Sequence, residues 1–174
     1  MGILRVDHPD ILNFITIKKN PKLLTNFNIS VAVTDKFMQA VLRNKYYDLI
    51  NPRTKKIVKR LNARNVFDLI VKNAWQTGDP GLIFIDEINR KNPTKHIGQI
   101  EATNPCGEQP LHPFESCVLG SINLAKIVEH RKINWEKLGK LVKLGVHFLD
   151  NIIDAQETSK QQINEKTGNN RRIG

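Results

Sequence analysis

One short segment of the sequence, residues 102–111, places a thiol, a carboxamide and a carboxylate within five positions. These groups belong to Cys106, Asn104 and Glu108, and two prolines and a glycine shape the segment into a loop. In an extended loop alternate residues point to the same side, so the three side chains should share one face. Such a trio could hold a small polar substrate, accept a proton and present a sulfur atom to it. The structural alternative is a turn with an incidentally buried cysteine.

The second cysteine, Cys117, follows eleven positions later and could be a small core residue at the start of a helix. A disulfide between Cys106 and Cys117 is disfavoured if the protein works in a reducing compartment. A zinc site made by these two cysteines and His112 lacks a fourth ligand and has no familiar spacing. We therefore expect no metal centre in this sequence.

The surrounding sequence predicts the elements that must position this loop. Three strand–helix alternations indicate an α/β fold with parallel strands. The run at 82–86 is continuously apolar, which is typical of a strand covered on both faces, whereas 26–33 alternates. We predict strands at 2–7, 26–33 and 82–86, an extended piece at 57–62, helices from about 11, at 34–43, 63–77, 118–130 and 135–153, a loop at 92–108, and a polar tail at 158–174.

Length and composition exclude several classes of protein. The chain has 174 residues and a formal net charge of +10, with 40% hydrophobic residues, which suits a folded domain. No run of 18 apolar residues occurs, and the charged N-terminal segment does not fit a signal peptide, so we expect a cytoplasmic protein without a membrane span. The basic residues are dispersed and aromatic residues make up only 6%, so nucleic acid is not expected as the main partner.

Two segments together resemble a known family. Asn-Pro-Cys-Gly-Glu-Gln-Pro-Leu at 104–111 and Ser-Cys-Val-Leu-Gly-Ser-Ile-Asn-Leu at 116–124 closely resemble the catalytic finger loop of ribonucleotide reductase large chains. The motif Asn-Pro-Cys-Gly-Glu is more typical of the adenosylcobalamin-dependent class than of the diiron-radical class. Supporting similarity covers 1–15, 23–38, 74–94 and 171–174, so the resemblance extends over essentially the whole chain.

The resemblance implies a fold and a set of roles. In that family the fold is a ten-stranded α/β barrel with the cysteine at the tip of a loop inside it. Cys106 would be the thiyl-radical site that takes the ribose 3′ hydrogen, and Glu108 would accept the 3′-hydroxyl proton. Asn104 would hold the ribose, and Cys117 would be one of two thiols that reduce the 2′ position. The substrate-binding segment would comprise Asn104, Pro105, Cys106, Gly107 and Glu108.

The basic segment at 18–25 has the position of the loop that, in this family, relays which deoxynucleotide or ATP effector is bound to the choice of substrate. The simpler alternative is an exposed lysine-rich turn. The residues assigned to this specificity loop are Lys18, Lys19, Asn20, Lys22 and Thr25.

The resemblance also implies partners that the chain itself does not contain. The second thiol of the reducing pair, the substrate-phosphate loop and the effector-site helices would lie in flanking segments. We therefore expect residues 1–174 to be the central part of the catalytic barrel, incomplete at both ends and inactive alone. The complete enzyme would need adenosylcobalamin, a ribonucleoside diphosphate or triphosphate as substrate, and an external dithiol. The alternatives are a fragment of a diiron-radical reductase, a non-catalytic basic module that binds nucleotide or nucleic acid, and a degenerate remnant.

Overall fold

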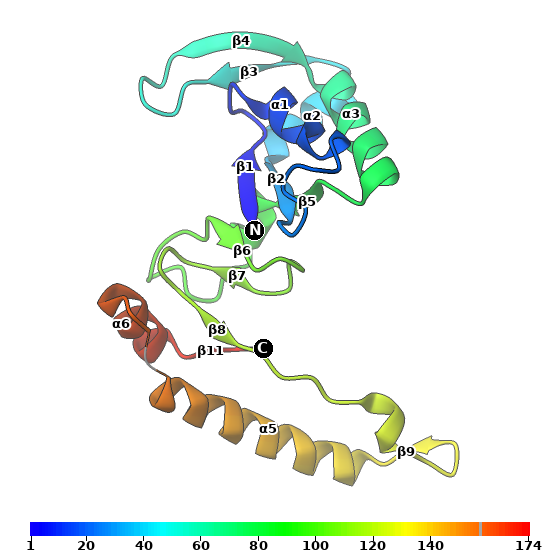
Figure 1. The fold of residues 1–174 in the computed structure, drawn as a ribbon, viewed down its shortest axis with the longest axis vertical. Coiled ribbons are helices and arrows are strands. Elements are labelled where there is room, and N and C mark those ends of the chain that lie inside the picture. The colour runs from blue at the N-terminus through cyan, green and yellow to red at the C-terminus, as the bar shows by residue number, and fades with distance from the viewer. Residues whose placement is uncertain (157) are drawn as a thin grey trace. The chain divides into compact units, whose positions relative to one another are not determined.

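The computed structural model describes residues 1–156 and 158–174, which divide into two compact units, Met1–Pro110 and Leu111–Gly174 (Figure 1). Each unit has its own helices and strands. No helix among the described residues is long and apolar enough to cross a membrane.

The first unit contains a three-stranded parallel sheet in the order β1-β2-β5, which confirms the predicted parallel strands. An antiparallel pair, β3 and β4, adds a hairpin, and short strands flank the loop at 104–109. The elements are β1 (Gly2–Arg5), α1 (Ile11–Thr16), η1 (Ile17–Lys19), β2 (Ile29–Val33), α2 (Asp35–Leu42), β3 (Tyr46–Ile50), β4 (Ile57–Asn62), α3 (Ala63–Thr77), β5 (Gly81–Phe84), α4 (Ile85–Arg90), β6 (Ala102–Thr103) and β7 (Pro110–Leu111).

The burial of the strands follows their place in the sheet. All five residues of β2 are buried because this strand lies between the other two, so the alternation predicted at 26–33 is wrong. β5 was expected to be covered on both faces, but it lies at the edge of the sheet and Phe84 is 49% exposed. Apolar pattern alone did not reveal which strand has a neighbour on each side.

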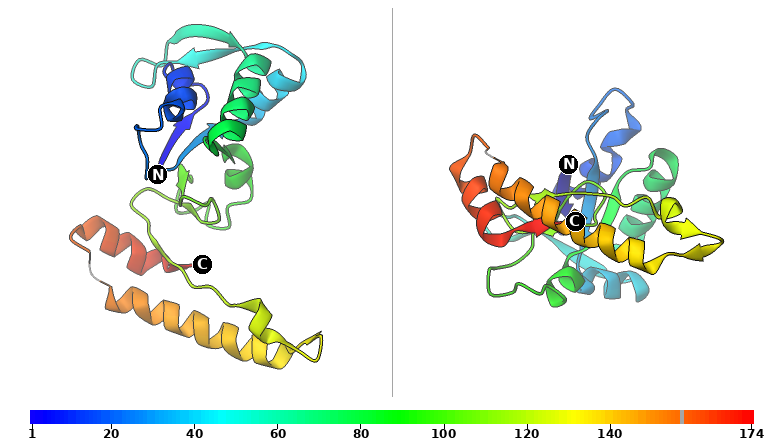
Figure 2. Two further views of the ribbon diagram at one scale, coloured as in Figure 1. Left: turned by 45° about the vertical axis from the view of Figure 1, so that its right-hand side comes forward. Right: turned by 90° about the horizontal axis from the view of Figure 1, so that it is seen from below.

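Local signals placed two helices correctly. Thr34 caps α2, where its hydroxyl oxygen accepts a hydrogen bond from the backbone N–H of Phe37 at 3.1 Å. α3 covers the predicted range and ends at Gly78, whose φ of +82° is a left-handed conformation that glycine adopts without strain. α2 and α3 pack side by side (Figures 1 and 2). The short helix α4 was not predicted, because Ile85 and Asp86 continue the apolar run of β5 in sequence.

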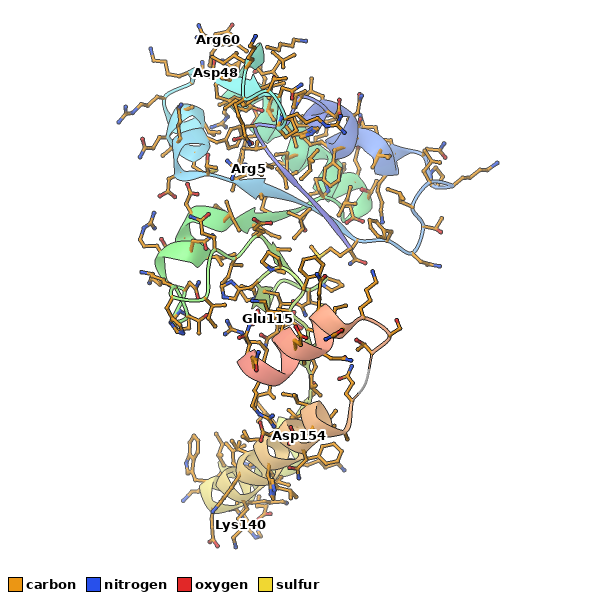
Figure 3. The ribbon with its side chains drawn as sticks, turned by 90° about the vertical axis from the view of Figure 1, so that its left-hand side faces the viewer. Arg5, Asp48, Arg60, Glu115, Lys140 and Asp154 are labelled. Atoms are coloured by element: carbon orange, nitrogen blue, oxygen red, sulfur yellow. The ribbon has the colours of Figure 1, made fainter. Side chains whose placement is uncertain are left out.

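The core of the first unit joins β2 to α1, α2, α3 and the β3–β4 hairpin. Phe37 is 1% exposed, and its ring meets that of Tyr47 edge-on, with centroids 4.9 Å apart. The Tyr47 hydroxyl donates a hydrogen bond of 3.1 Å to the carbonyl oxygen of Val6. On the exposed side of the hairpin, Arg60 and Asp48 form an ion pair at 2.7 Å (Figure 3). These contacts fix β3, a strand that the sequence analysis missed.

The second unit is built around a long helix, α5, and a short parallel pair, β8 and β11 (Figure 2). The helix predicted at 135–153 is confirmed, and it begins where Asn134 accepts a hydrogen bond from the backbone N–H of Lys137 at 2.9 Å. The elements of the second unit are β8 (Cys117–Val118), η2 (Leu124–Ile127), β9 (Val128–Glu129), β10 (Lys132–Ile133), α5 (Trp135–Ala155), α6 (Gln161–Asn170) and β11 (Arg172–Ile173).

The helix predicted at 118–130 is wrong. This stretch holds the end of β8, the short 3₁₀ helix η2 and the first strand of the β9–β10 hairpin. Asn123 begins η2 by accepting a hydrogen bond from the backbone N–H of Ala125 at 3.1 Å. His130 and Arg131 both have positive φ, at 51° and 65°, which reverses the chain between β9 and β10. Short side-chain-capped turns therefore replace the expected helix.

Candidate active site

The segment between β6 and β7 is a tight hydrogen-bonded turn rather than the extended loop that we expected. The backbone N–H of Gly107 donates to the carbonyl oxygen of Asn104 at 3.0 Å. The backbone N–H of Asn104 donates to the carbonyl oxygen of Gln109 at 3.1 Å. Gly107 has a φ of +84°, which closes the turn and which other residues rarely adopt. Strict alternation of side chains does not apply to a turn, so another contact must bring the polar side chains together.

That contact comes from the side chain of Asn104, which lies across the loop. Its Nδ2 donates to Oε1 of Glu108 at 2.5 Å, and its Oδ1 accepts from the backbone N–H of Gln109 at 2.9 Å. Both polar atoms of the Asn104 amide are therefore used to shape the loop. The carboxylate of Glu108 is exposed and held by this hydrogen bond.

Cys106 lies in the same turn, between Asn104 and Glu108, and carries an exposed free thiol. The alternative of an incidentally buried cysteine is therefore wrong, and the disulfide with Cys117 is not formed. Pro105 and Gly107, on either side of Cys106, are also exposed. The first unit thus presents sulfur, amide and carboxylate on one short turn. Cys117 belongs to the second unit, where it lies half-buried in β8.

A cavity of about 880 Å³ lies in the first unit near the ends of the parallel strands. Its charged lining includes Arg5, Asp7 and Asp86, and Glu101 at its wall leads directly into β6. Arg5 forms two hydrogen bonds with Asp7, from Nε at 3.0 Å and from Nη2 at 2.8 Å. The hydrogen bonds to Asp7 raise the pKa of Arg5, against the opposing effect of burial. Ligands in α/β proteins commonly bind at the carboxyl ends of parallel strands.

The basic segment at 18–25 is mostly exposed, with one exception. Lys19 ends η1, and Asn20 begins a turn in which its side-chain oxygen accepts the N–H of Lys22 at 3.0 Å. Thr25 lies further along the same exposed stretch. Lys18 differs, because its side chain is only 14% exposed and its Nζ forms an ion pair with Asp79 at 3.0 Å. A simple exposed lysine-rich turn does not describe this residue.

Asp79 contacts Lys18 at the start of this segment and Ile29 four residues beyond its end, a role that was not predicted from the sequence. One carboxylate oxygen pairs with Lys18 at the start, and the other accepts the backbone N–H of Ile29, in β2, at 3.3 Å. The only signal was its place in the turn Gly78-Asp79-Pro80-Gly81, which is compatible with many roles. Among the described residues, no group of three or more His, Cys, Asp or Glu side chains is arranged to hold a metal ion.

Comparison with known proteins covers the entire chain. The family described as "Ribonucleotide reductase, barrel domain" matches residues 1–174. The vitamin B12-dependent ribonucleoside-diphosphate reductase of Thermoplasma acidophilum is 55% identical over 100% of this chain and 23% of its own length. The protein of the same name from Mycobacterium tuberculosis is 49% identical, over 100% of this chain and 25% of its own length. The vitamin B12-dependent ribonucleotide reductase of Streptomyces clavuligerus is 31% identical, over 100% and 21% respectively.

The chain thus spans about a quarter of the length of the curated relatives that it matches. The match includes both the turn that carries Cys106 and the strand that carries Cys117. On this evidence the chain belongs to the ribonucleotide reductase barrel-domain family.

Proposed function

We propose that this chain is the central part of the catalytic barrel of a cobalamin-dependent ribonucleoside-diphosphate reductase, which makes deoxyribonucleotides by thiyl-radical chemistry. The observation that carries the proposal is the exposed thiol of Cys106 on a turn whose Asn104 amide holds the Glu108 carboxylate. The names of the relatives that match along the whole chain support it. In this proposal β1, β2 and β5 are strands of a ten-stranded α/β barrel, and the turn at 104–109 is part of its finger loop.

The three side chains of the turn have distinct tasks in the proposed reaction. Cys106, as a thiyl radical, takes the 3′ hydrogen atom of the ribose and later returns it. Glu108 accepts the proton of the 3′ hydroxyl, which favours departure of the neighbouring 2′ hydroxyl as water. Asn104 orients Glu108 and binds the ribose. An exposed carboxylate held by one amide can accept a proton without first breaking a buried ion pair.

Reduction at the 2′ position needs two electrons and two protons, which two thiols provide. In the proposed reaction Cys117 is one of them, and a cysteine from another part of the reductase is the other, since the chain has only two. A disulfide forms as the 2′ hydroxyl leaves as water and hydrogen takes its place. An external dithiol then reduces the disulfide and is itself oxidised, which completes the cycle.

Adenosylcobalamin would supply the one-electron chemistry that turns the Cys106 thiol into a radical. The exposed position of Cys106 fits such a cofactor, because a hydrogen atom can be removed only from a thiol that the cofactor can approach. The contribution of the protein is then to hold Cys106, Asn104 and Glu108 in one arrangement around the ribose.

Substrate and effectors complete the proposal. The cavity near the ends of β1 and β5 adjoins the segment that leads into β6, and its volume lies in the range of ligand sites. We assign it to the ribonucleotide side of the barrel. The segment at 18–25 is assigned to the specificity loop, which would respond to a deoxynucleotide or ATP effector.

A chimera tests the proposal. Residues 1–174 replace the matching segment of the Thermoplasma acidophilum relative, and deoxynucleotide formation is measured from each of the four ribonucleotides with a dithiol, with and without adenosylcobalamin. We expect product only with the cofactor present. Product formed equally well without it would contradict the dependence on cobalamin, and absence of any product from a folded, nucleotide-binding chimera would contradict the proposed function.

A further inference from the structure

The side chain of Glu115 is fully buried in the second unit, two residues before Cys117. Its Oε1 accepts hydrogen bonds from Nδ2 of Asn170 at 2.6 Å and from Nε of Arg172 at 3.0 Å. Its Oε2 accepts the backbone N–H of His112 at 2.8 Å. A buried carboxylate needs such partners to offset the loss of water. Asn170 ends α6 and Arg172 begins β11, so these two donors join both elements to the segment before β8, where Glu115 lies (labelled in Figure 3).

The partners of Glu115 also keep it ionised. Burial on its own would raise the pKa of Glu115, but the hydrogen bonds from His112, Arg172 and Asn170 outweigh burial and hold the pKa below its ordinary value. The carboxylate and the Arg172 guanidinium therefore form a charged pair at neutral pH. Loss of Arg172 would leave the buried carboxylate without its cation, and loss of Glu115 would leave the mostly buried guanidinium, 20% exposed, without its anion. Either change is more disruptive than loss of a surface ion pair.

The same contacts determine where Cys117 lies. β8 and β11 are parallel, and Cys117 is directly opposite Arg172 in the register. Next to it, the hydroxyl groups of Ser116 and Thr167 are hydrogen-bonded at 2.7 Å. Each strand has only two residues, and the pairing continues only through Gly174, which donates to the carbonyl oxygen of Val118 at 2.9 Å and accepts from the N–H of Gly120 at 2.8 Å. A ladder this short offers few backbone hydrogen bonds to fix the register. Arg172 is thus both the ion partner of Glu115 and the cross-strand neighbour of Cys117.

We infer that Glu115 is a positioning residue for the Cys117 thiol, which it holds in place by clamping β8 to β11. The catalytic meaning of this inference rests on the proposed function, in which Cys117 reduces the 2′ position. A displacement of about 1 Å can slow a reaction by about 100-fold, so a thiol on such short strands needs a separate anchor. In this inference Glu115 acts through the position of the Cys117 thiol and not through contact with the nucleotide. Its loss should therefore affect kcat rather than KM.

The test compares Glu115→Gln with the matched control Glu129→Gln in the chimera. Glu129 also accepts hydrogen bonds from an asparagine amide and a cation, Asn134 and Lys137, both at 2.9 Å, but it is 46% exposed and lies in β9. For each variant, kcat and KM for the ribonucleotide are measured. Alkylation of Cys117 by iodoacetamide is followed separately by peptide mass spectrometry, well below the melting temperature.

Glu115→Gln is expected to lower kcat by about 10- to 100-fold, to leave KM within about twofold, and to speed alkylation of Cys117 by about tenfold. Glu129→Gln should leave all three within about twofold. The inference is overturned if Glu115→Gln behaves like the control. If the chimera does not reduce ribonucleotides at all, the alkylation rate of Cys117 still tests whether Glu115 holds β8 against β11. Faster alkylation in Glu115→Gln alone would then support the positioning role while contradicting the proposed function.

A milder variant covers the case in which Glu115→Gln does not fold. Asn170→Ala removes one donor and leaves the Glu115–Arg172 ion pair in place. It is expected to speed alkylation of Cys117 by about threefold at a nearly unchanged melting temperature. An unchanged alkylation rate in a folded Asn170→Ala protein would overturn the clamp.

Discussion

The amide nitrogen of Asn104 donates a hydrogen bond of 2.5 Å to the carboxylate of Glu108, across a turn whose other exposed side chains include Cys106. The amide oxygen of Asn104 is used at the same time by the backbone N–H of Gln109. In the proposed reaction this arrangement separates two roles, because Asn104 would set the geometry and Glu108 would remain available as a base. The two roles can be tested by different substitutions.

Glu108→Gln keeps the shape of the side chain and an oxygen that can accept a hydrogen bond from Asn104, but it removes the proposed base. In the chimera we expect kcat to fall by about 10² to 10⁴-fold, while the dissociation constant for the ribonucleotide stays within about threefold. Steady-state kinetics and equilibrium nucleotide binding check this. Equal losses in turnover and binding would contradict the role of Glu108 as a base.

Asn104→Ala removes both side-chain hydrogen bonds of the turn and should act through geometry. We expect kcat to fall by about 100-fold because Glu108 is no longer held in place. Asn92→Ala is the control, since Asn92 also shapes a turn in the first unit, where its Oδ1 accepts the backbone N–H of Thr94 at 2.9 Å. Activity within about threefold of the parent protein in Asn104→Ala would argue against the positioning role.

Asp79→Asn should alter substrate choice rather than the overall rate. The substitution weakens the ion pair with Lys18, at the start of the segment at 18–25, while Ile29 beyond its end can still donate to the side-chain oxygen. We expect the ratio of kcat/KM values among the four ribonucleotides, at a fixed effector, to change by about fivefold or more. Asp68→Asn is the control, because Asp68 pairs with Arg64 on α3 and both side chains are more than half exposed. Equal ratios in both variants would contradict a role of Asp79 in positioning the proposed specificity loop.

Phe37 anchors the core of the first unit, so Phe37→Ala should lower the free energy of unfolding of the 174-residue chain by about 3–5 kcal/mol. The side chain is 1% exposed and packs on Tyr47. Leu42→Ala, at the end of the same helix, is the control, since Leu42 is 81% exposed and should cost less than about 0.5 kcal/mol. Urea unfolding followed by circular dichroism measures both. Similar values for the two variants would contradict the described core.

The lowered pKa of Glu115 should make the stability of the second unit depend on pH. Because its folded-state pKa is lowered, its contribution to stability is present above the ordinary glutamate value of 4.5 and is lost as the pH falls through the folded-state pKa. Asp150 and Asp154, whose pKa values are lowered by hydrogen bonds from Arg171, act in the same direction. Urea unfolding between about pH 3 and about pH 6 should show a shallower loss of stability in Glu115→Gln than in the parent chain. Parallel pH profiles would contradict the buried ion pair.

Much of the first unit could be predicted from local sequence. The helical period and the terminal glycine gave α3, Thr34 gave the start of α2, and apolar runs gave the three parallel strands. Burial could not be predicted in the same way, since it depends on which strand lies in the middle of the sheet. β3 was missed because the short run Tyr46–Ile50 becomes a strand only by pairing with β4.

The candidate site, too, was predictable only where its features are local in sequence. Cys106, Asn104 and Glu108 are close in sequence, so their types and spacing alone were informative. The turn that joins Asn104 to Glu108 was not predicted, because it depends on the positive φ of Gly107. Contacts between distant positions, such as Glu115 with Arg172, have no local signal at all. They depend on the folded chain bringing together elements that the sequence keeps apart.

The most direct test of the proposed reductase function is Cys106→Ser in the chimera, with adenosylcobalamin and a dithiol present. Serine keeps the size and the exposed position of the side chain but cannot form a thiyl radical. Deoxyribonucleotide formation should fall by at least about 10³-fold, while ribonucleotide binding stays within about twofold of the parent chimera. Product formation within about tenfold of the parent would contradict radical chemistry at Cys106 and with it the proposed function.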